Sequence, residues 1–144
     1  MKITESLASE HRVYCRVFDQ IERLLPGQRT LEGVKALAQL AEELLRAHSR
    51  AEEGTVLAAL DHCLEQRGQR EGFYQQHREI DARLAQVQAA VQLSRARRLL
   101  QEALAFSRRH FAQEESSLFP LAEQLMQAST LRELDSARLQ PPWD

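Results

Sequence analysis

The sequence has few of the residues that interrupt helices, since only five glycines and four prolines occur among its 144 residues. None of them lies between Phe73 and Phe119. β-Branched residues are also scarce, whereas Leu, Ala, Glu, Gln and Arg dominate. This composition favours helices, and no strand-like alternation accompanies it. We therefore predict an all-α chain.

Cysteines and long apolar runs are rare as well, and each absence excludes a class of protein. Cys15 and Cys63 are too few for a disulfide scaffold or for the usual thiolate zinc sites, and they suit a reducing cytoplasm. No run of about 18 apolar residues is present. Residues 1–6 lack the apolar core of a secretory signal. We expect a cytoplasmic protein with no membrane partner.

Charge of one sign is not in excess, because 19 basic and 21 acidic residues give a net charge of -2. Domains that bind nucleic acids are usually clearly basic. We therefore expect no nucleic-acid partner. A length of 144 residues with 43% hydrophobic residues suits a single domain built around one core.

Breaks in the pattern divide the chain into four helices, at about 4–25, 30–60, 72–93 and 94–128, and a tail over 129–144. The second helix either ends or bends near 59–61, or residues 61–71 fold over the end of the bundle. Pro120 should kink or restart the fourth helix, and the tail should hold a short helix before Pro141. Four helices with short connections predict an up-down-up-down four-helix bundle with a short C-terminal tail.

Four of the five histidines fall on the faces that such helices bury, where residues are spaced alternately three and four apart. These buried rows are Leu7, His11, Tyr14, Phe18, Ile21 and Leu25; Val34, Leu37, Ala41, Leu44 and His48; Phe73, His77, Ile80, Leu84, Val87 and Val91; and Leu99, Ala103, Phe106 and His110. One buried histidine is usually a hydrogen-bonded core residue, but four need a common partner. Neutral imidazole binds iron, zinc and copper well. We predict a metal site, and we read His62, about 21 Å along the helix from His48, as non-ligating.

Two carboxylates share faces with two of these histidines. Glu52 follows His48 by four residues, and Glu114 follows His110 by four. Residues four apart lie on the same side of a helix, one turn from each other. Pairs of glutamates are common on solvated surfaces, but that reading does not explain why the string H-x-x-x-E-E occurs twice. We predict that both helices offer an imidazole and a carboxylate to the same site.

These residues resemble the hemerythrin-like HHE cation-binding domain family of bacterial type, along most of the chain. The resemblance rests on residues 8–12, 48–57, 76–81 and 110–120, the last of which ends in Leu-Phe-Pro. It implies a four-helix bundle around two non-haem iron ions. The implied nitrogen ligands are His11, His48, His77 and His110, and the implied bridging carboxylates are Glu52 and Glu114. Glu115 is a rival to Glu114, because some oxygen carriers place this carboxylate five residues after the histidine, which needs a distorted helix. Regular helix geometry favours Glu114.

One position departs from the oxygen-carrying members of this family. They have a fifth histidine ligand four residues before the position of His77, where this chain has Phe73. The resemblance then implies an open or water-filled position on one iron, or a substitute ligand among Tyr14, Tyr74 and Asp81. This departure argues against an oxygen carrier.

Three functions follow, in order of preference. The first is a di-iron protein that binds or reacts with oxygen, peroxide or nitric oxide, in sensing, stress defence or iron handling. The second is a zinc or manganese site with a structural or hydrolytic role. The third is a metal-free helical interaction module. In such a module, Glu52, Glu114 and water would have to form the hydrogen bonds that the buried histidines need. A nucleophilic role for Cys15, four residues after His11, is not expected.

Overall fold

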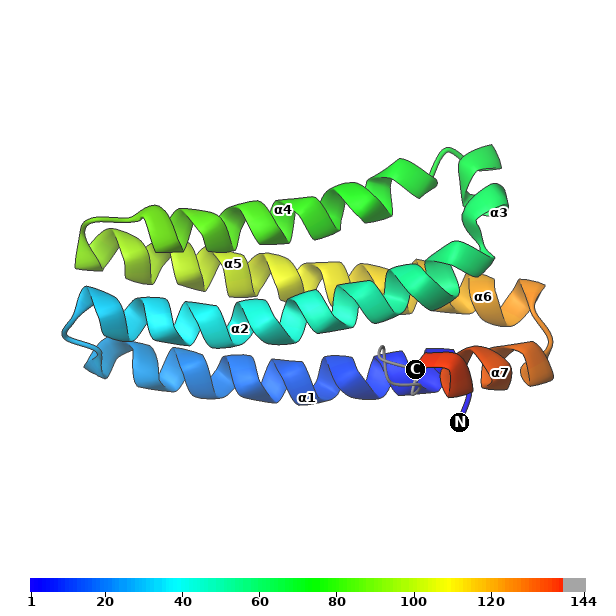
Figure 1. The fold of residues 1–144 in the computed structure, drawn as a ribbon, viewed down its shortest axis with the longest axis horizontal. Helices are drawn as coiled ribbons and strands as arrows, with labels where there is room; N and C mark the ends of the chain where they lie inside the picture. Colours follow the sequence, from blue (N-terminus) through cyan, green and yellow to red (C-terminus); the bar gives the residue numbers. More distant parts are fainter. Residues whose placement is uncertain (139–144) are drawn as a thin grey trace.

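The computed structural model describes residues 1–138, and these residues form helices joined by short turns (Figure 1). The α-helices are α1 (Ile3–Leu24), α2 (Leu31–Glu52), α3 (Asp61–Gln66), α4 (Arg70–Ala89), α5 (Leu93–Gln113), α6 (Phe119–Leu125) and α7 (Ala128–Arg138). A 3-10 turn, η1 (Leu25–Gly27), follows α1, and two π-helical turns, η2 (Glu53–Leu57) and η3 (Glu114–Leu118), follow α2 and α5. The prediction of an all-α chain is confirmed, since residues 1–138 contain no strand.

The four longest helices, α1, α2, α4 and α5, lie side by side and alternate in direction along the chain (Figure 1). The prediction of four helices and a short tail helix was too simple, because α3 and α6 are also separate helices. Thr30 caps α2, since its Oγ1 accepts a hydrogen bond from the N–H of Gly33 at 3.1 Å. Pro120 lies in the first turn of α6, so the predicted restart of the last long helix is observed.

The end of the predicted second helix is divided into several pieces. After η2 the chain turns at Leu60, and α3 runs across the end of α2 (Figure 1). Gly68 then adopts a φ of 70°, a left-handed conformation that glycine adopts without steric cost. This turn directs α4 back along the other long helices. Residues 61–66 therefore fold over the end of the helices, which was the second of the two alternatives.

The two π-helical turns begin at the predicted carboxylates: η2 starts directly after Glu52, and η3 starts at Glu114. Both turns contain a hydroxyl that donates to a carbonyl four residues earlier: Thr55 to Ala51 at 2.7 Å, and Ser117 to Gln113 at 2.7 Å. Such bonds satisfy carbonyls where the helix widens. The prediction of regular helices over 30–60 and 94–128 was therefore wrong at these turns.

The apolar core is split into two clusters with a polar layer between them. One cluster contains Phe18, Leu45, Ile80 and Phe111, and the other contains Leu7, Val56, Phe73 and Leu118. Along each long helix a predicted histidine falls between a residue of one cluster and a residue of the other. The four histidines therefore occupy one level, which the two apolar clusters close off from either end.

Most of the predicted buried rows are buried or half-buried, with one clear exception. Val91 is 85% exposed, because α4 ends at Ala89 and Val91 lies in the connection to α5. The short helix predicted for the tail corresponds to α7, whereas Pro141 lies outside the described residues. Among residues 1–138, none of the helices combines the length and apolar composition that crossing a bilayer requires.

Candidate metal centre

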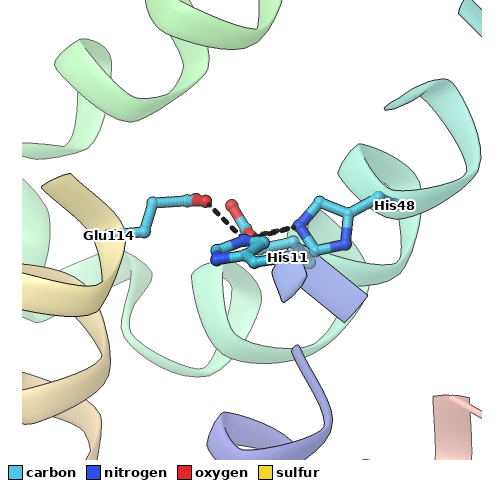
Figure 2. A group of neighbouring side chains, drawn as sticks. His11, His48 and Glu114 are labelled. Atoms are coloured by element: carbon cyan, nitrogen blue, oxygen red, sulfur yellow. Dashed lines mark hydrogen bonds and ion pairs between the residues drawn. The ribbon is translucent and has the colours of Figure 1, made fainter. Parts of the chain in front are cut away.

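Six predicted ligands meet at the polar layer, and all of them are buried. They are His11 from α1, His48 and Glu52 from α2, His77 from α4, His110 from α5 and Glu114 from η3. Both carboxylates are 0% exposed and the histidines are at most 4% exposed. Figure 2 shows three of these side chains, with His11 lying between Glu114 and His48. Four chain segments that are far apart in sequence thus supply one site.

The donor atoms divide into two groups that share both carboxylates. One group contains His11 and His48, and the other contains His77 and His110, while Glu52 and Glu114 belong to both. Within each group the donor atoms lie within 4.8 Å of one another. Glu52 faces both groups, since Oε2 is 3.2 Å from Nε2 of His48 and Oε1 is 3.1 Å from Nε2 of His77. This is the arrangement that two neighbouring cations bridged by carboxylates require.

The spacing between donor atoms fits ligands that converge on a cation. The Nε2 atoms of His11 and His48 are 3.0 Å apart, and Nε2 of His11 is 3.3 Å from Oε1 of Glu114. Two metal–ligand bonds of ~2.1 Å that meet at a right angle place their ligand atoms ~3.0 Å apart. Imidazole nitrogen and carboxylate oxygen together suit iron, zinc and manganese.

Several of these atoms lack a hydrogen-bond partner among the described residues. They are Oε2 of Glu52, both carboxylate oxygens of Glu114 and Nε2 of His110. Oε1 of Glu114 lies 3.2 Å from Nε2 of His110, but the two atoms are not aligned for a hydrogen bond. Buried carboxylate oxygens without partners carry a large desolvation cost. Cations between them would satisfy these atoms, so the donor set fits a pair of metal ions.

The other ring nitrogen of each histidine is held from outside the centre, by residues that the sequence reasoning missed. Nδ1 of His48 contacts Glu10 at 2.8 Å, and Nδ1 of His77 contacts Glu53 at 2.9 Å. The remaining two contacts are from Nδ1 of His11 to Glu115 at 3.3 Å and from Nδ1 of His110 to the Gln76 side chain. Such outer contacts set the tautomer and orientation of a ligating ring. All four imidazoles therefore direct Nε2 into the centre.

These outer partners follow a pattern that could have been found in the sequence. Glu10 and Gln76 each directly precede a predicted ligand, and Glu53 and Glu115 each directly follow one. Each partner holds the histidine of a different long helix, so the contacts link neighbouring helices. The second glutamate of each H-x-x-x-E-E string thus has a defined place. The histidine that this glutamate contacts is determined by helix packing, so it could not be predicted from the sequence.

The structure separates Glu114 from its rival Glu115. The Glu114 side chain is 0% exposed and belongs to both donor groups, whereas the Glu115 side chain is 43% exposed and contacts His11 from the outside. Glu114 is thus the residue whose position suits a bridging carboxylate. A π-helical turn starts at Glu114, four residues after His110, so the helix is distorted here. The residue that faces inward is nevertheless Glu114, the one that regular helix geometry favours.

The residue at the fifth-histidine position, Phe73, and the predicted substitute Asp81 both lie outside the donor groups. Phe73 is buried in the apolar cluster that also contains Leu7 and Val56, and Tyr74 packs against that cluster. Asp81 is exposed and lies outside both donor groups. The Tyr14 ring lies edge-on to His48, with centroids 5.4 Å apart, and burial raises the pKa of its hydroxyl to about 12. His62 is exposed and outside both groups, as expected.

The two carboxylates have opposite pKa shifts. Burial raises the pKa of Glu114 well above its usual range, and the negative charge of Glu52 adds to this effect. Burial also acts to raise the pKa of Glu52, but the neighbouring imidazoles of His48 and His77 outweigh burial and hold that pKa well below its usual range. Without a cation, Glu114 therefore has a higher affinity for a proton than Glu52 has.

The histidines are shifted in pairs. Burial lowers the pKa of His11 to about 3 and that of His110 to about 4. Burial acts in the same direction on His48 and His77, but hydrogen bonds with carboxylates outweigh it and raise their pKa values to about 9 and about 10. Protonated imidazoles thus offset the buried negative charge. Metal ions bind neutral imidazole, so metal uptake would release these protons.

A surface pocket of about 300 Å³ reaches the site beside His11. Its lining includes Phe111, Cys15 and Glu115. The Phe111 ring stacks on His11, with centroids 4.1 Å apart and ring planes inclined by 11°. Burial raises the pKa of the Cys15 thiol, which argues against a nucleophilic thiolate, as expected. His11 is the predicted ligand in the lining of this pocket.

The comparisons with known proteins agree with this geometry. No curated protein and no solved structure matches the chain. The family model described as "Hemerythrin HHE cation binding domain" matches residues 2–122, which include all six predicted ligands. With this match over most of its length, the chain belongs to the hemerythrin HHE cation-binding domain family.

Proposed function

We propose that this protein is a hemerythrin-like di-iron protein, an up-down-up-down four-helix bundle whose centre binds or reacts with oxygen, peroxide or nitric oxide. The observation that carries the proposal is the pair of buried donor groups that share Glu52 and Glu114. Two carboxylates that face two groups of imidazoles are suited to two cations at close range. Non-haem iron at such a site supplies redox electrons and open coordination positions to small ligands.

The donor count supports a reaction with small ligands. Each group offers four side chains, and the Phe73 position provides no further ligand. An ion with six coordination positions therefore keeps some of them free for an added molecule. The pocket beside His11 is the proposed approach for oxygen, peroxide or nitric oxide. These features support sensing, stress defence or iron handling above oxygen transport.

The surrounding residues exclude water and orient the ligands. Phe111 and Phe119 stack on His11, with the Phe119 centroid 5.5 Å away. The two apolar clusters on either side of the metal centre limit the access of solvent to it. A dry and rigid setting strengthens electrostatic interactions between the side chains and bound cations. The cytoplasm is the proposed location, where the free thiols of Cys15 and Cys63 remain reduced.

Metal analysis and spectroscopy test this proposal. Protein expressed in iron-rich medium should contain about two irons per chain and show near-ultraviolet absorption from paired ferric ions. Adding peroxide, or nitric oxide to the reduced protein without air, should change that spectrum. Zinc has higher intrinsic affinity than ferrous iron at many nitrogen and oxygen sites. Two zinc ions with no visible spectrum after iron loading would favour the structural or hydrolytic alternative, and less than one metal per chain would contradict any metal centre.

A further inference from the structure

Helix α7 lies outside the segment that the family model matches, yet it packs beside the metal centre. In Figure 1 it lies alongside the beginning of α1. Leu131 is 0% exposed and belongs to the same apolar cluster as Leu7 and Val56. Val56 is part of η2, the turn that follows Glu52. Helix α7 is therefore docked against two of the segments that carry the predicted ligands.

An ion pair connects the end of α7 to a predicted ligand. Nη1 of Arg138 donates to Oε1 of Glu10 at 2.5 Å, and the other carboxylate oxygen, Oε2, accepts from Nδ1 of His48 at 2.8 Å. Asp135, which is buried, lies 3.4 Å from Nη2 of Arg138 and orients the guanidinium. The side chains of Arg138 and Glu10 are only 18% and 23% exposed. This contact is more sheltered than an ordinary surface ion pair, which contributes little.

The position of Glu10 explains how Arg138 acts on the centre. One oxygen is held by the guanidinium, so the carboxylate cannot rotate away from His48. A fixed carboxylate on Nδ1 orients the imidazole ring so that Nε2 faces the centre. The other donor group is held differently, since Nδ1 of His77 contacts Glu53 and Nδ1 of His110 contacts Gln76. The contact between Arg138 and Glu10 therefore reaches a histidine of only one of the two groups.

We propose that Arg138 is a positioning residue that acts through Glu10 on His48, and that docking of α7 controls how firmly the cation at His11 and His48 is held. This inference rests on the proposed metal centre. It makes the C-terminal helix part of a site whose ligands all precede it in the chain. Loss of the contact between Arg138 and Glu10 would weaken the metal position at His48, whereas His77 and His110 would keep their own outer partners, Glu53 and Gln76.

The test uses zinc as the probe, because zinc is diamagnetic and suits the donor set. Arg138→Gln should speed the release of one of two zinc ions to a chelator about tenfold, since outer partners of ligating histidines typically account for 10- to 100-fold in affinity. The second zinc should leave at the wild-type rate. Arg132→Gln is the matched control, because Arg132 is on the same helix and forms no ion pair within residues 1–138. Arg138→Lys should restore most of the slow release.

A second measurement separates positioning from a general effect on folding. In zinc-free protein, the NMR signal of the His48 Nδ1 proton should shift in Arg138→Gln and stay unchanged in Arg132→Gln. Glu10→Gln should shift the same signal, and adding Arg138→Gln to it should have little further effect, because both changes act through one contact. If Arg138→Gln does not fold, Glu10→Gln alone must still show the faster release of one zinc.

The outcomes separate this inference from the proposed function. Equal zinc release and equal His48 signals in Arg138→Gln and Arg132→Gln would overturn the inference. Faster release of both zinc ions would also overturn it, since the contact would then be only a general support of the fold. If wild-type protein takes up fewer than two zinc ions, the paired centre fails, while the His48 signal still decides whether Arg138 positions that ring.

Discussion

Replacing Glu114 with Gln should abolish the paired metal centre, whereas the same change at Glu115 should leave two ions bound. Glu114 is fully buried and is shared by both donor groups. Its carboxylate is required at both positions, because a neutral amide neither bridges nor offsets the charge of two cations. Glu115 only contacts Nδ1 of His11 from outside, where an amide oxygen can still accept a hydrogen bond.

Metal content and affinity decide this prediction. We expect Glu114→Gln to retain at most one weakly bound ion, with affinity at least about 100-fold lower, which exceeds the upper range for losing an outer partner. Glu115→Gln should lose about 10-fold or less. The reverse order, with Glu115 indispensable and Glu114 dispensable, would show that the carboxylate five residues after His110 is the bridging one.

Removing bound metal should lower the melting temperature substantially. Without cations, both Glu114 oxygens, one Glu52 oxygen and Nε2 of His110 are buried and unpaired. An ion present at a thousand times its dissociation constant adds about 4 kcal/mol to the free energy of unfolding. For a chain of this length 1 kcal/mol corresponds to about 2–4 °C. Two ions together should therefore raise the melting temperature by about 20 °C.

Calorimetry of the loaded protein with and without a chelator measures this difference. Glu114→Gln is the control, and chelator should hardly change its melting temperature. A metal-free interaction module would behave in the opposite way. Chelator would then have no effect on the wild-type protein, and replacing His48 and His110 with Leu would stabilise it, because apolar groups fill a buried polar site at lower cost.

The positions of the six candidate ligands were predictable because they follow from helix periodicity. A helix of 3.6 residues per turn places His48 and Glu52 on one side whatever surrounds them. The same argument applies to His110 and Glu114. The structure brings all six side chains together, and the family match supports the resemblance on which their roles were based. Their binding of iron remains a prediction that metal analysis must test.

The π-helical turns after Glu52 and at Glu114 could not be predicted from periodicity. A π-helical turn replaces local i to i-4 hydrogen bonds with wider ones, which is unfavourable in an isolated helix. It persists where side chains such as Thr55 and Ser117 satisfy the freed carbonyls and where packing holds the wider turn. The distortion depends on contacts outside the helix.

The sequence by itself determined the all-helical character, the family and the inward face of each ligand-bearing helix. These depend on composition and on spacing within one helix, which are local properties. Only the tertiary structure decided that Glu10, Glu53, Gln76 and Glu115 hold the outer nitrogens and that Arg138 reaches the site. Each of these depends on the register and rotation of one helix against another. That register is set by the packing of the two apolar clusters as a whole, and no short stretch of sequence encodes it.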